Sequence, residues 1–453
     1  MKELRILSPT AILGYGFPIE SFEAGMQRKP DVIAVDAGST DPGPYYLGAG
    51  ISFTDPNAVK RDLEILIPAG IEAKIPVIIG SAGGSGGTPH VELTLNIIKK
   101  IAKEKKLSFK LAIIQSEFDK EYIKDELKKG NVTPLYPAKP ITEKNVDESV
   151  RIVAQMGEEP FIKALEAGAD VILAGRSYDP SVFASLAVMK GFDKGLALHL
   201  GKILECAAIT CLPGSGSDCM FGYLQEDGFI LEPLSPERKC TTLSVAAHTL
   251  YEKTNPYELP GPGGKLNLHA TKFDQLTENK VHVKGTKFEP TDEYYVKLEG
   301  VRKVGYRTIS CAATKDPIMI SKIDDIVASV KHRVEDNFKH YGMDFFLDFK
   351  IYGKNGVMAM FDGVESSVGD ELLIIIEAVA QTQEQADTIC GFARSTMLHY
   401  GYEGRISTAG NLAFPFSPSD CHVGEVFEFN VYHLLRVDDP VKPFPITYIN
   451  FEN

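Results

Sequence analysis

The first half of the chain alternates short apolar runs with longer amphipathic stretches, and this alternation limits the fold more than any other feature. The apolar runs are rich in Val and Ile and are bounded by Gly, Pro or Asp, as buried strands are; they cover residues 31–35, 75–79, 109–114 and 170–174. The intervening stretches have helical spacing and cover 58–73, 91–105, 120–129 and 159–167. Parallel strands need crossovers of about this length, so residues 1–230 are predicted to form a three-layer α/β domain with a mostly parallel sheet.

The pattern changes after residue 212. Turn residues dominate segments 213–218, 231–237 and 255–265. A second series of regular elements then begins. It consists of predicted strands at 308–312, 345–352 and 372–379 and predicted helices at 321–338 and 381–399. This β-α-β-β-α order predicts an α+β domain with helices on one face of an antiparallel sheet. Residues 231–453 are therefore expected to hold a loop-rich middle and this C-terminal α+β domain.

The charge of the chain argues against polyanionic partners. Its 453 residues include 48 Lys and Arg against 61 Asp and Glu, a formal net charge of −13. Such a surface repels phosphate backbones and anionic lipids unless it carries a basic patch. Basic residues gather only in short groups, such as the one at 99–106, which has the spacing of a solvated helix face. We therefore expect neither a nucleic-acid nor a membrane partner.

The cysteines and the N-terminus predict a cytoplasmic protein. Seven cysteines lie between Cys206 and Cys421 with no CxxC pair, which fits neither a disulfide framework nor a structural zinc site. The N-terminal residues lack the apolar core of about 7–15 residues that a secretory signal needs. The longest apolar runs, such as 372–376, are far shorter than the roughly 18 residues of a membrane span.

A polar loop follows the predicted strand at 31–35. Its carboxylates and hydroxyls belong to four candidate site residues: Asp36, Ser39, Thr40 and Asp41. The two carboxylates could coordinate a divalent cation, or one could act as general base while the other holds a substrate hydroxyl. The structural alternative is that Asp41 only caps a turn before Pro42.

A glycine-rich loop follows the strand at 75–79 and leads into a helix. Its candidate substrate-binding residues are Ser81, Gly83, Gly84 and Ser85. Open backbone N–H groups at a helix start suit a phosphate or carboxylate. The loop matches neither the P-loop nor the GxGxxG fingerprint, so the sequence gives no evidence for ATP or NAD. A loop that only turns tightly is the alternative.

A third loop follows the strand at 170–174 and carries Arg176 and Asp179. Arg176 offers a bidentate fork to an anion, and Asp179 is a candidate acid or base; alternatively, the two pair and hold the loop shut. Because ligands bind at the carboxyl ends of parallel strands, the three loops are expected to meet in one crevice. Helical spacing places Lys202, a substrate-binding candidate, near Glu205, a catalytic candidate. The alternative is a helix that buries Cys206 as a small hydrophobe and leaves Lys202 in solvent.

Four motifs resemble the acyclic terpene utilisation protein A family. They are VDAGSTDPGPYYLG at 35–48, IIGSAGG at 78–84, AGRSYDPS at 174–181 and KILEC at 202–206, and the resemblance extends over nearly the whole chain. Many relatives have histidine where Lys202 stands. Longer, otherwise similar members carry an additional C-terminal segment, and its absence here implies a small partner subunit that supplies it. The namesake members act in bacterial pathways that degrade branched, terpene-derived acids as CoA thioesters.

These features together predict an enzyme of carboxylic-acid catabolism, a lyase or hydratase acting on a small carboxylate or an acyl-CoA. Arg176 and the loop at 80–87 would hold the anionic group of the substrate, and Asp36, Asp41 or Asp179 would move the proton. A divalent cation beside these carboxylates is one form of this hypothesis. Two alternatives stay open, namely acyl or carboxyl transfer on a CoA thioester and a non-catalytic subunit of a catabolic complex. A homo-oligomer is expected.

Overall fold

The computed structural model describes residues 2–252, 254–358 and 368–452. The chain forms two units, Met1–Arg302 with Phe429–Asn453, and Lys303–Glu428, which are described separately. Residues 230 and 231, between which the sequence placed a domain boundary, both lie in strand β9 of the first unit. Among the described residues, no helix combines the length and the apolar character needed to cross a bilayer.

A ten-stranded mixed sheet forms the centre of the first unit, in the order β12-β13-β9-β8-β1-β2-β3-β7-β4-β19. Its middle is parallel and consists of β1 (Leu4–Ser8), β2 (Val32–Asp36), β3 (Val77–Gly80), β7 (Val171–Ala174) and β4 (Phe109–Ile114). Antiparallel strands extend it on both sides: β8 (Met220–Leu224), β9 (Gly228–Pro233), β13 (Val281–Lys284), β12 (Lys272–Gln275) and β19 (Ile446–Phe451). The predicted α/β fold class is confirmed.

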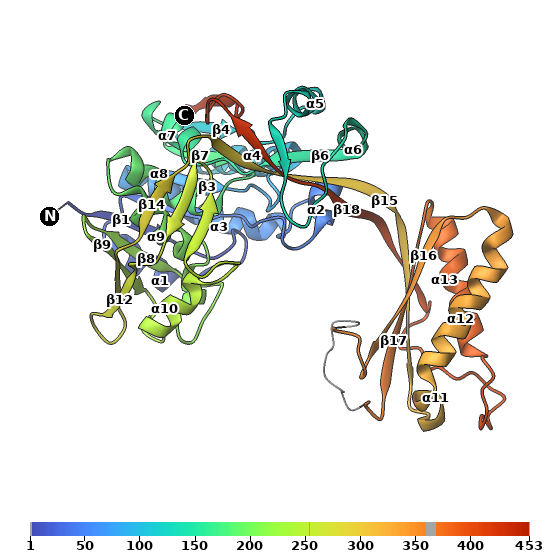
Figure 1. The fold of residues 1–453 in the computed structure, drawn as a ribbon. Helices are drawn as coiled ribbons and strands as arrows, with labels where there is room; N and C mark the ends of the chain where they lie inside the picture. The colour runs from blue at the N-terminus through green and yellow to red at the C-terminus, as the bar shows by residue number, and fades with distance from the viewer. Residues whose placement is uncertain (1, 253, 359–367, 453) are drawn as a thin grey trace. The chain divides into compact units, whose positions relative to one another are not determined.

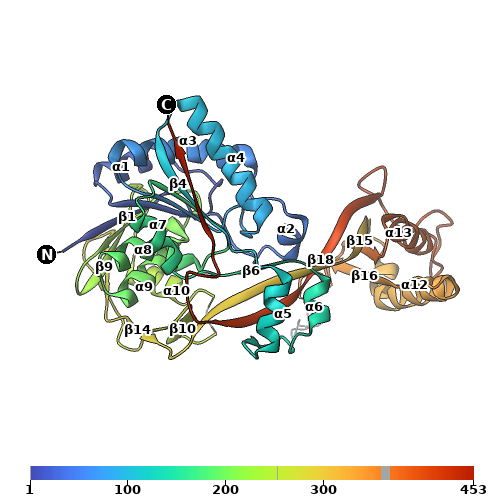
Figure 2. The ribbon, with the colours of Figure 1, turned by 90° about the horizontal axis from the view of Figure 1, so that it is seen from above.

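Helices cover both faces of this sheet, which gives the three predicted layers (Figure 2). One core packs α1 (Ile19–Gln27), α3 (Pro56–Ala73) and α4 (Thr88–Lys105) against alternate strand residues such as Ile33 and Ile79. The other core packs α7 (Glu159–Glu166), α8 (Asp179–Met189) and α9 (Lys194–Leu204) against residues such as Ala34 and Ile78. Because both faces of the central strands are largely buried, these strands are mostly apolar, as the sequence pattern indicated.

The remaining elements of the first unit are short. They are α2 (Pro44–Ala49), α5 (Lys120–Lys128), β5 (Val132–Pro134), α6 (Glu143–Glu148), β6 (Ser149–Ala154), η1 (Ala207–Thr210), α10 (Thr242–Thr249), β10 (Glu258–Gly261), β11 (Gly264–Asn267) and β14 (Lys287–Pro290). The middle segment, expected to be rich in loops, thus contains many strands. Most of them span four residues between turns, which is too short to show a clear alternating pattern in the sequence.

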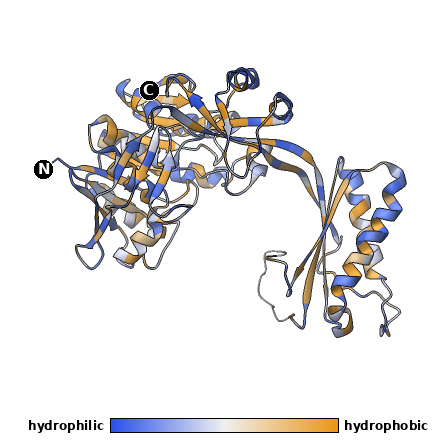
Figure 3. Cartoon of the chain, in the orientation of Figure 1, coloured by the Kyte–Doolittle hydropathy of each residue, from blue (hydrophilic) through white to orange (hydrophobic). Residues whose placement is uncertain are grey.

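The second unit confirms the predicted β-α-β-β-α order (Figure 1). Its sheet has the order β16-β17-β15-β18, formed by β16 (Phe345–Tyr352), β17 (Leu372–Ala380) and parts of β15 (Tyr294–Thr314) and β18 (Asp420–Val437). The helical elements are α11 (Pro317–Ser321), α12 (Ile323–Phe338), η2 (Lys339–Tyr341) and α13 (Gln383–Leu398). Alternate residues of β17, among them Ile374 and Ile376, form one apolar core with α12 and α13 (Figure 3).

Candidate functional site

The loops that follow β2, β3 and β7 meet at the carboxyl edge of the parallel strands. Asp36 at the end of β2 pairs with Gly80 at the end of β3. The Ser81 N–H donates to the Gly175 carbonyl at 3.1 Å, which joins the second loop to the third. The structure therefore brings together the three segments that the sequence placed at one edge.

A cavity of about 270 Å³ opens beside these loops in the first unit. Five carboxyl-bearing residues line it: Asp36, Asp41, Asp179, Glu205 and Glu252. Apolar and aromatic side chains, including Ile12, Tyr15, Phe53 and Tyr251, complete the wall, and Ser39 contributes as well. All four residues predicted to be catalytic therefore face one space, which we call the acidic cavity.

Three of these acids hold protons more tightly than exposed carboxyls do. Burial raises the pKa of Asp36 well above its ordinary value, and the charge of Asp179 raises it further. Burial also raises the pKa of Glu205 well above the usual range, although Lys202 opposes it. The pKa of Asp179 is raised by burial too, against the lowering effect of Arg176 and Lys202. Three close acids with raised pKa values can share protons, so the cavity can hold a proton donor and a proton acceptor together.

Two of these acids have an oxygen that the fold does not use. Asp36 accepts a hydrogen bond from the Gly38 N–H through Oδ2 at 2.8 Å. Among the described residues, the buried atoms Asp36 Oδ1 and Glu205 Oε2 have no hydrogen-bond partner. Leaving a buried polar oxygen unpaired costs about 1–3 kcal/mol, so such an atom is typical of a position that a ligand completes.

Arg176 is buried behind the cavity wall, and its donors are used inside the protein. Nε donates to Glu299 Oε2 and Nη1 to Asp179 Oδ1, each at 2.8 Å. Nη1 also lies 3.2 Å from the Ser81 hydroxyl oxygen. Arg176 is only 2% exposed and does not line the acidic cavity. This arrangement favours the alternative in which an Arg–Asp pair holds the third loop in place.

Lys202 has a similar supporting position. Its Nζ donates to Glu205 Oε1 at 2.6 Å and to Glu252 Oε2 at 2.9 Å. Burial lowers the pKa of the Lys202 ammonium, but the charges of the two glutamates outweigh burial and raise it overall. Lys202 therefore stays charged and fixes both carboxylates on the cavity wall. The sequence did not indicate Glu252, because it follows α10 in a segment that matches no motif.

The glycine loop packs against the neighbouring loops instead of opening to the cavity. Its residues Ser81, Gly83, Gly84 and Ser85 are all buried. The sequence predicted that an anionic ligand binds at the start of α4. In the structure a carboxylate of the protein lies there, because the Thr88 N–H donates to Glu117 Oε2 at 2.7 Å. The chain's own carboxylate thus uses the N-terminal donor that a substrate anion was expected to use.

The polar loop after β2 combines both roles considered for it. Ser39 Oγ donates to Asp41 Oδ2 at 2.7 Å, and the Asp41 N–H donates back to Ser39 Oγ at 3.1 Å. These bonds are typical of a self-stabilised turn, yet both residues line the acidic cavity. Thr40 is buried and lines a second cavity of about 510 Å³ in the same unit, which shares Asp41 with the first. The second cavity is also bounded by Lys297, Phe429 and Tyr432.

The described residues also bear on metal binding and on thiol chemistry. Across the part of the chain that the structure describes, no group of three or more His, Cys, Asp or Glu side chains is arranged to hold a metal ion. Cys206 lines the acidic cavity. Burial raises the pKa of its thiol, and the charge of Glu205 raises it further. A thiol held in its protonated form is a poor nucleophile.

Replacing Gly86 with Ala is expected to destabilise the protein by about 1–2 kcal/mol more than replacing Gly130 with Ala. Both glycines have left-handed φ angles, +67° and +76°. A Cβ on Gly86 would lie 2.0 Å from the Arg176 backbone nitrogen, whereas nothing lies within 4 Å of one on Gly130. Chemical denaturation of both variants measures the difference. Equal losses would contradict the close packing of the second and third loops.

The family comparison agrees with the sequence motifs. A family model described as acyclic terpene utilisation family protein AtuA matches residues 55–215 and 227–412, well over half of the chain. No curated protein and no solved structure matches the chain.

Proposed function

The chain belongs to the acyclic terpene utilisation family of AtuA, and from this premise we propose that it is a hydro-lyase of carboxylic-acid catabolism, which adds or removes water beside an acyl carbonyl. The family description indicates a catabolic role. The observation that carries the proposed reaction is the group of three carboxyls on the wall of one cavity, the buried Asp36 and Glu205 and the half-buried Asp179. Elimination of water needs a base and an acid held together, and these residues supply both.

The surroundings of the acids suggest their roles. Asp179 accepts a hydrogen bond from Arg176 at 2.8 Å, and the positive charges of Arg176 and Lys202 favour its ionised form. Asp179 is therefore assigned as the base. Asp36 accepts its hydrogen bond from the neutral Gly38 N–H. Its buried Oδ1 has no hydrogen-bond partner among the described residues. Asp36 is assigned as the protonated acid.

In the dehydration direction, Asp179 removes a proton from the carbon next to the acyl carbonyl. The electron pair of that C–H bond forms the C=C bond, and the C–O bond to the hydroxyl on the next carbon breaks. Asp36 gives its proton to the departing oxygen, which leaves as water. The products are an α,β-unsaturated acyl compound and water. The enzyme returns to its starting state when one proton moves from Asp179 to Asp36. Hydration runs through the same steps in reverse.

The charge of the cavity favours a thioester over a free acid as the substrate. Five carboxyl-bearing residues line the wall, while Arg176 and Lys202 already donate to protein carboxylates. A free substrate carboxylate would add a like charge without an available cation beside it. A thioester carbonyl is neutral and avoids this repulsion. The neighbouring cavity with Lys297, Phe429 and Tyr432 leaves room for more of the substrate than its reacting carbons.

The proposed function is tested with matched pairs of substrates. Purified protein is given 3-hydroxyacyl-CoA thioesters of several chain lengths, branched and linear, and the corresponding free 3-hydroxy acids. Formation of the enoyl product is followed by its ultraviolet absorbance and by mass spectrometry. We expect kcat/KM for the thioester to exceed that for the free acid by about 100-fold or more. Preference for the free acid would contradict the thioester assignment, and no gain or loss of water with any acyl compound would contradict the hydro-lyase.

A further inference from the structure

Strand β16 forms an edge of the sheet in the second unit. Among the described strands it has β17 as its neighbour on one side and none on the other. It runs for eight residues, FFLDFKIY, without proline or glycine. A long, regular edge strand presents a row of backbone N–H and C=O groups to which another strand can add.

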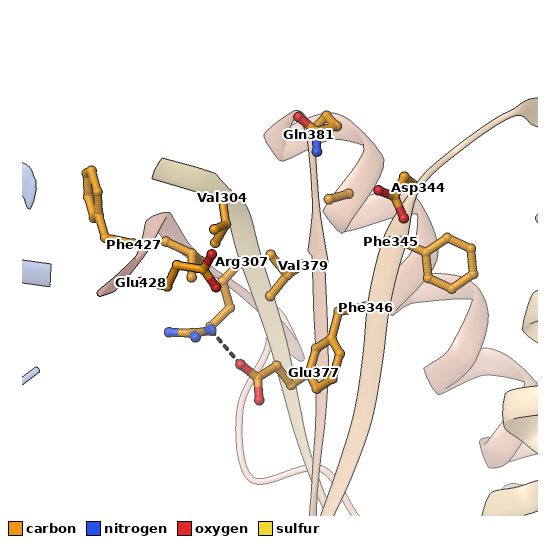
Figure 4. A pocket seen from close by; sticks show the side chains of 12 residues that line it. Val304, Arg307, Asp344, Phe345, Phe346, Glu377, Val379, Gln381, Phe427 and Glu428 are labelled. Carbon is orange, nitrogen blue, oxygen red and sulfur yellow. Dashed lines mark ion pairs between the residues drawn. The ribbon is translucent and has the colours of Figure 1, made fainter. Parts of the chain in front are cut away.

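The two faces of β16 differ in their packing. Phe345, Leu347, Phe349 and Ile351 belong to the apolar core formed with the helices. Phe346 and Tyr352 point to the other face and are 56% and 38% exposed. Figure 4 shows the rings of Phe345 and Phe346 on opposite sides of the strand. The outer face of β16 therefore alternates an aromatic residue, Asp348, Lys350 and a second aromatic residue.

This outer face is complementary to itself. In an antiparallel pair of two β16 strands centred on Phe349, Asp348 lies across from Lys350 of the second copy, and Phe346 lies across from Tyr352. Opposite charges and aromatic pairs at directly opposed positions stabilise antiparallel strands. The same register places Leu347 across from Ile351 on the core side. Each contact occurs twice, because a two-fold axis through the two Phe349 residues repeats it.

Asp348 has an acidic neighbour within its own sheet and is contacted by two lysines. On β17, Asp348 lies directly across from Glu377, a like charge. Lys331 of α12 lies 3.1 Å from Asp348, and Lys350 lies 3.4 Å from Asp348 and also contacts Glu377. Arg307 pairs with Glu377 from the far side, at 2.6 Å (Figure 4). A second Lys350 brought to this edge would add a positive charge beside two neighbouring acids, Asp348 and Glu377.

From this register we propose that the occupant of the β16 edge is a second copy of the chain, joined antiparallel so that the two sheets become one. The resulting interface is isologous, with Asp348 and Lys350 of each copy opposite Lys350 and Asp348 of the other. This proposal does not depend on the reaction assigned to the first unit.

The test uses charge reversal in the full chain. Analytical ultracentrifugation is expected to show a dimer for the unchanged protein. Lys350→Asp places acids across from acids, and Asp348→Lys places lysines across from lysines, so each variant alone is expected to dimerise at least about tenfold more weakly. An equimolar mixture of the two variants restores both opposite-charge pairs and is expected to regain the dimer as a heterodimer. A tag on one variant identifies the mixed species.

Far-ultraviolet circular dichroism and thermal unfolding of each variant check that the second unit remains folded. A variant that unfolded alone could not regain a dimer of native affinity in the mixture, so recovery supports the proposal even where the single variants are weakened. The proposal is overturned if the unchanged chain is monomeric, if both single variants dimerise like the unchanged chain, or if the mixture of folded variants stays monomeric.

Discussion

Asp36→Asn is expected to lower turnover by about 10²–10⁴-fold, the usual contribution of a positioned acid or base. The amide keeps the size of the side chain and can still accept from the Gly38 N–H, but it cannot deliver a proton to a leaving hydroxyl. Steady-state kinetics with the best thioester found for the unchanged protein measures the loss. A fall in kcat without a matching rise in KM would place the defect in the chemical step.

The same replacement is expected to stabilise the folded protein at neutral and alkaline pH. Burial raises the folded-state pKa of Asp36 well above its ordinary value. An acid with a raised folded-state pKa contributes stability below its unfolded pKa, and that contribution is lost as pH rises through the folded pKa. Asparagine carries no charge, so the variant escapes this loss. In thermal unfolding, the midpoint of Asp36→Asn should exceed that of the unchanged protein by an amount that grows as pH rises from acid to alkaline.

Asp41→Asn is the matched control for Asp36→Asn. Asp41 lines the same cavity but is exposed, and it accepts from Ser39 at 2.7 Å. We expect it to change turnover far less than Asp36→Asn. Equal losses of turnover in the two variants would contradict the assignment of the acid to Asp36.

The central parallel strands β2, β3, β4 and β7 and the longest helices could be predicted, because burial leaves a local apolar pattern in the sequence. These four strands are largely buried on both faces, so each has a mostly apolar sequence rich in Val, Ile or Leu. The order of elements in the second unit was equally clear. The short strands from β10 to β14 were missed because four residues between turns give no reliable period.

The acids of the site could be predicted, but their partners could not. Asp36, Asp41 and Asp179 follow strands whose carboxyl ends share one edge, which topology alone dictates. Glu299 binds Arg176 across 123 residues of sequence, and Glu252 binds Lys202 across 50. Such partners are chosen by tertiary packing, and no local spacing marks them. This is why Arg176, read from sequence as a substrate clamp, is held by protein carboxylates in the structure.

Glu299→Gln is expected to cost about 3–5 kcal/mol of folding free energy, because removing one partner leaves a buried charge without compensation. Glu299 is 2% exposed and accepts from Arg176 at 2.8 Å, and Lys297 lies 2.8 Å from its other oxygen. Arg176 would keep only Asp179 as a charged partner. Since Arg176 also positions Asp179, turnover should fall together with stability.

The pH dependence of this loss distinguishes the ion pair from simple packing. Burial raises the pKa of Glu299, but Arg176 and Lys297 outweigh it and lower the pKa to about 2. An acid with a depressed folded-state pKa contributes stability above its unfolded pKa, and that contribution disappears as pH falls through the folded value. The difference between the unchanged protein and Glu299→Gln should therefore be constant from about pH 5 to 8 and shrink between about pH 4 and 2. Glu293→Gln, which removes an exposed pair with Arg436 at 3.0 Å, should cost far less, because solvent screens exposed charges. A loss for Glu299→Gln as small as this control would show that Arg176 does not depend on Glu299, and the third loop would then need another anchor.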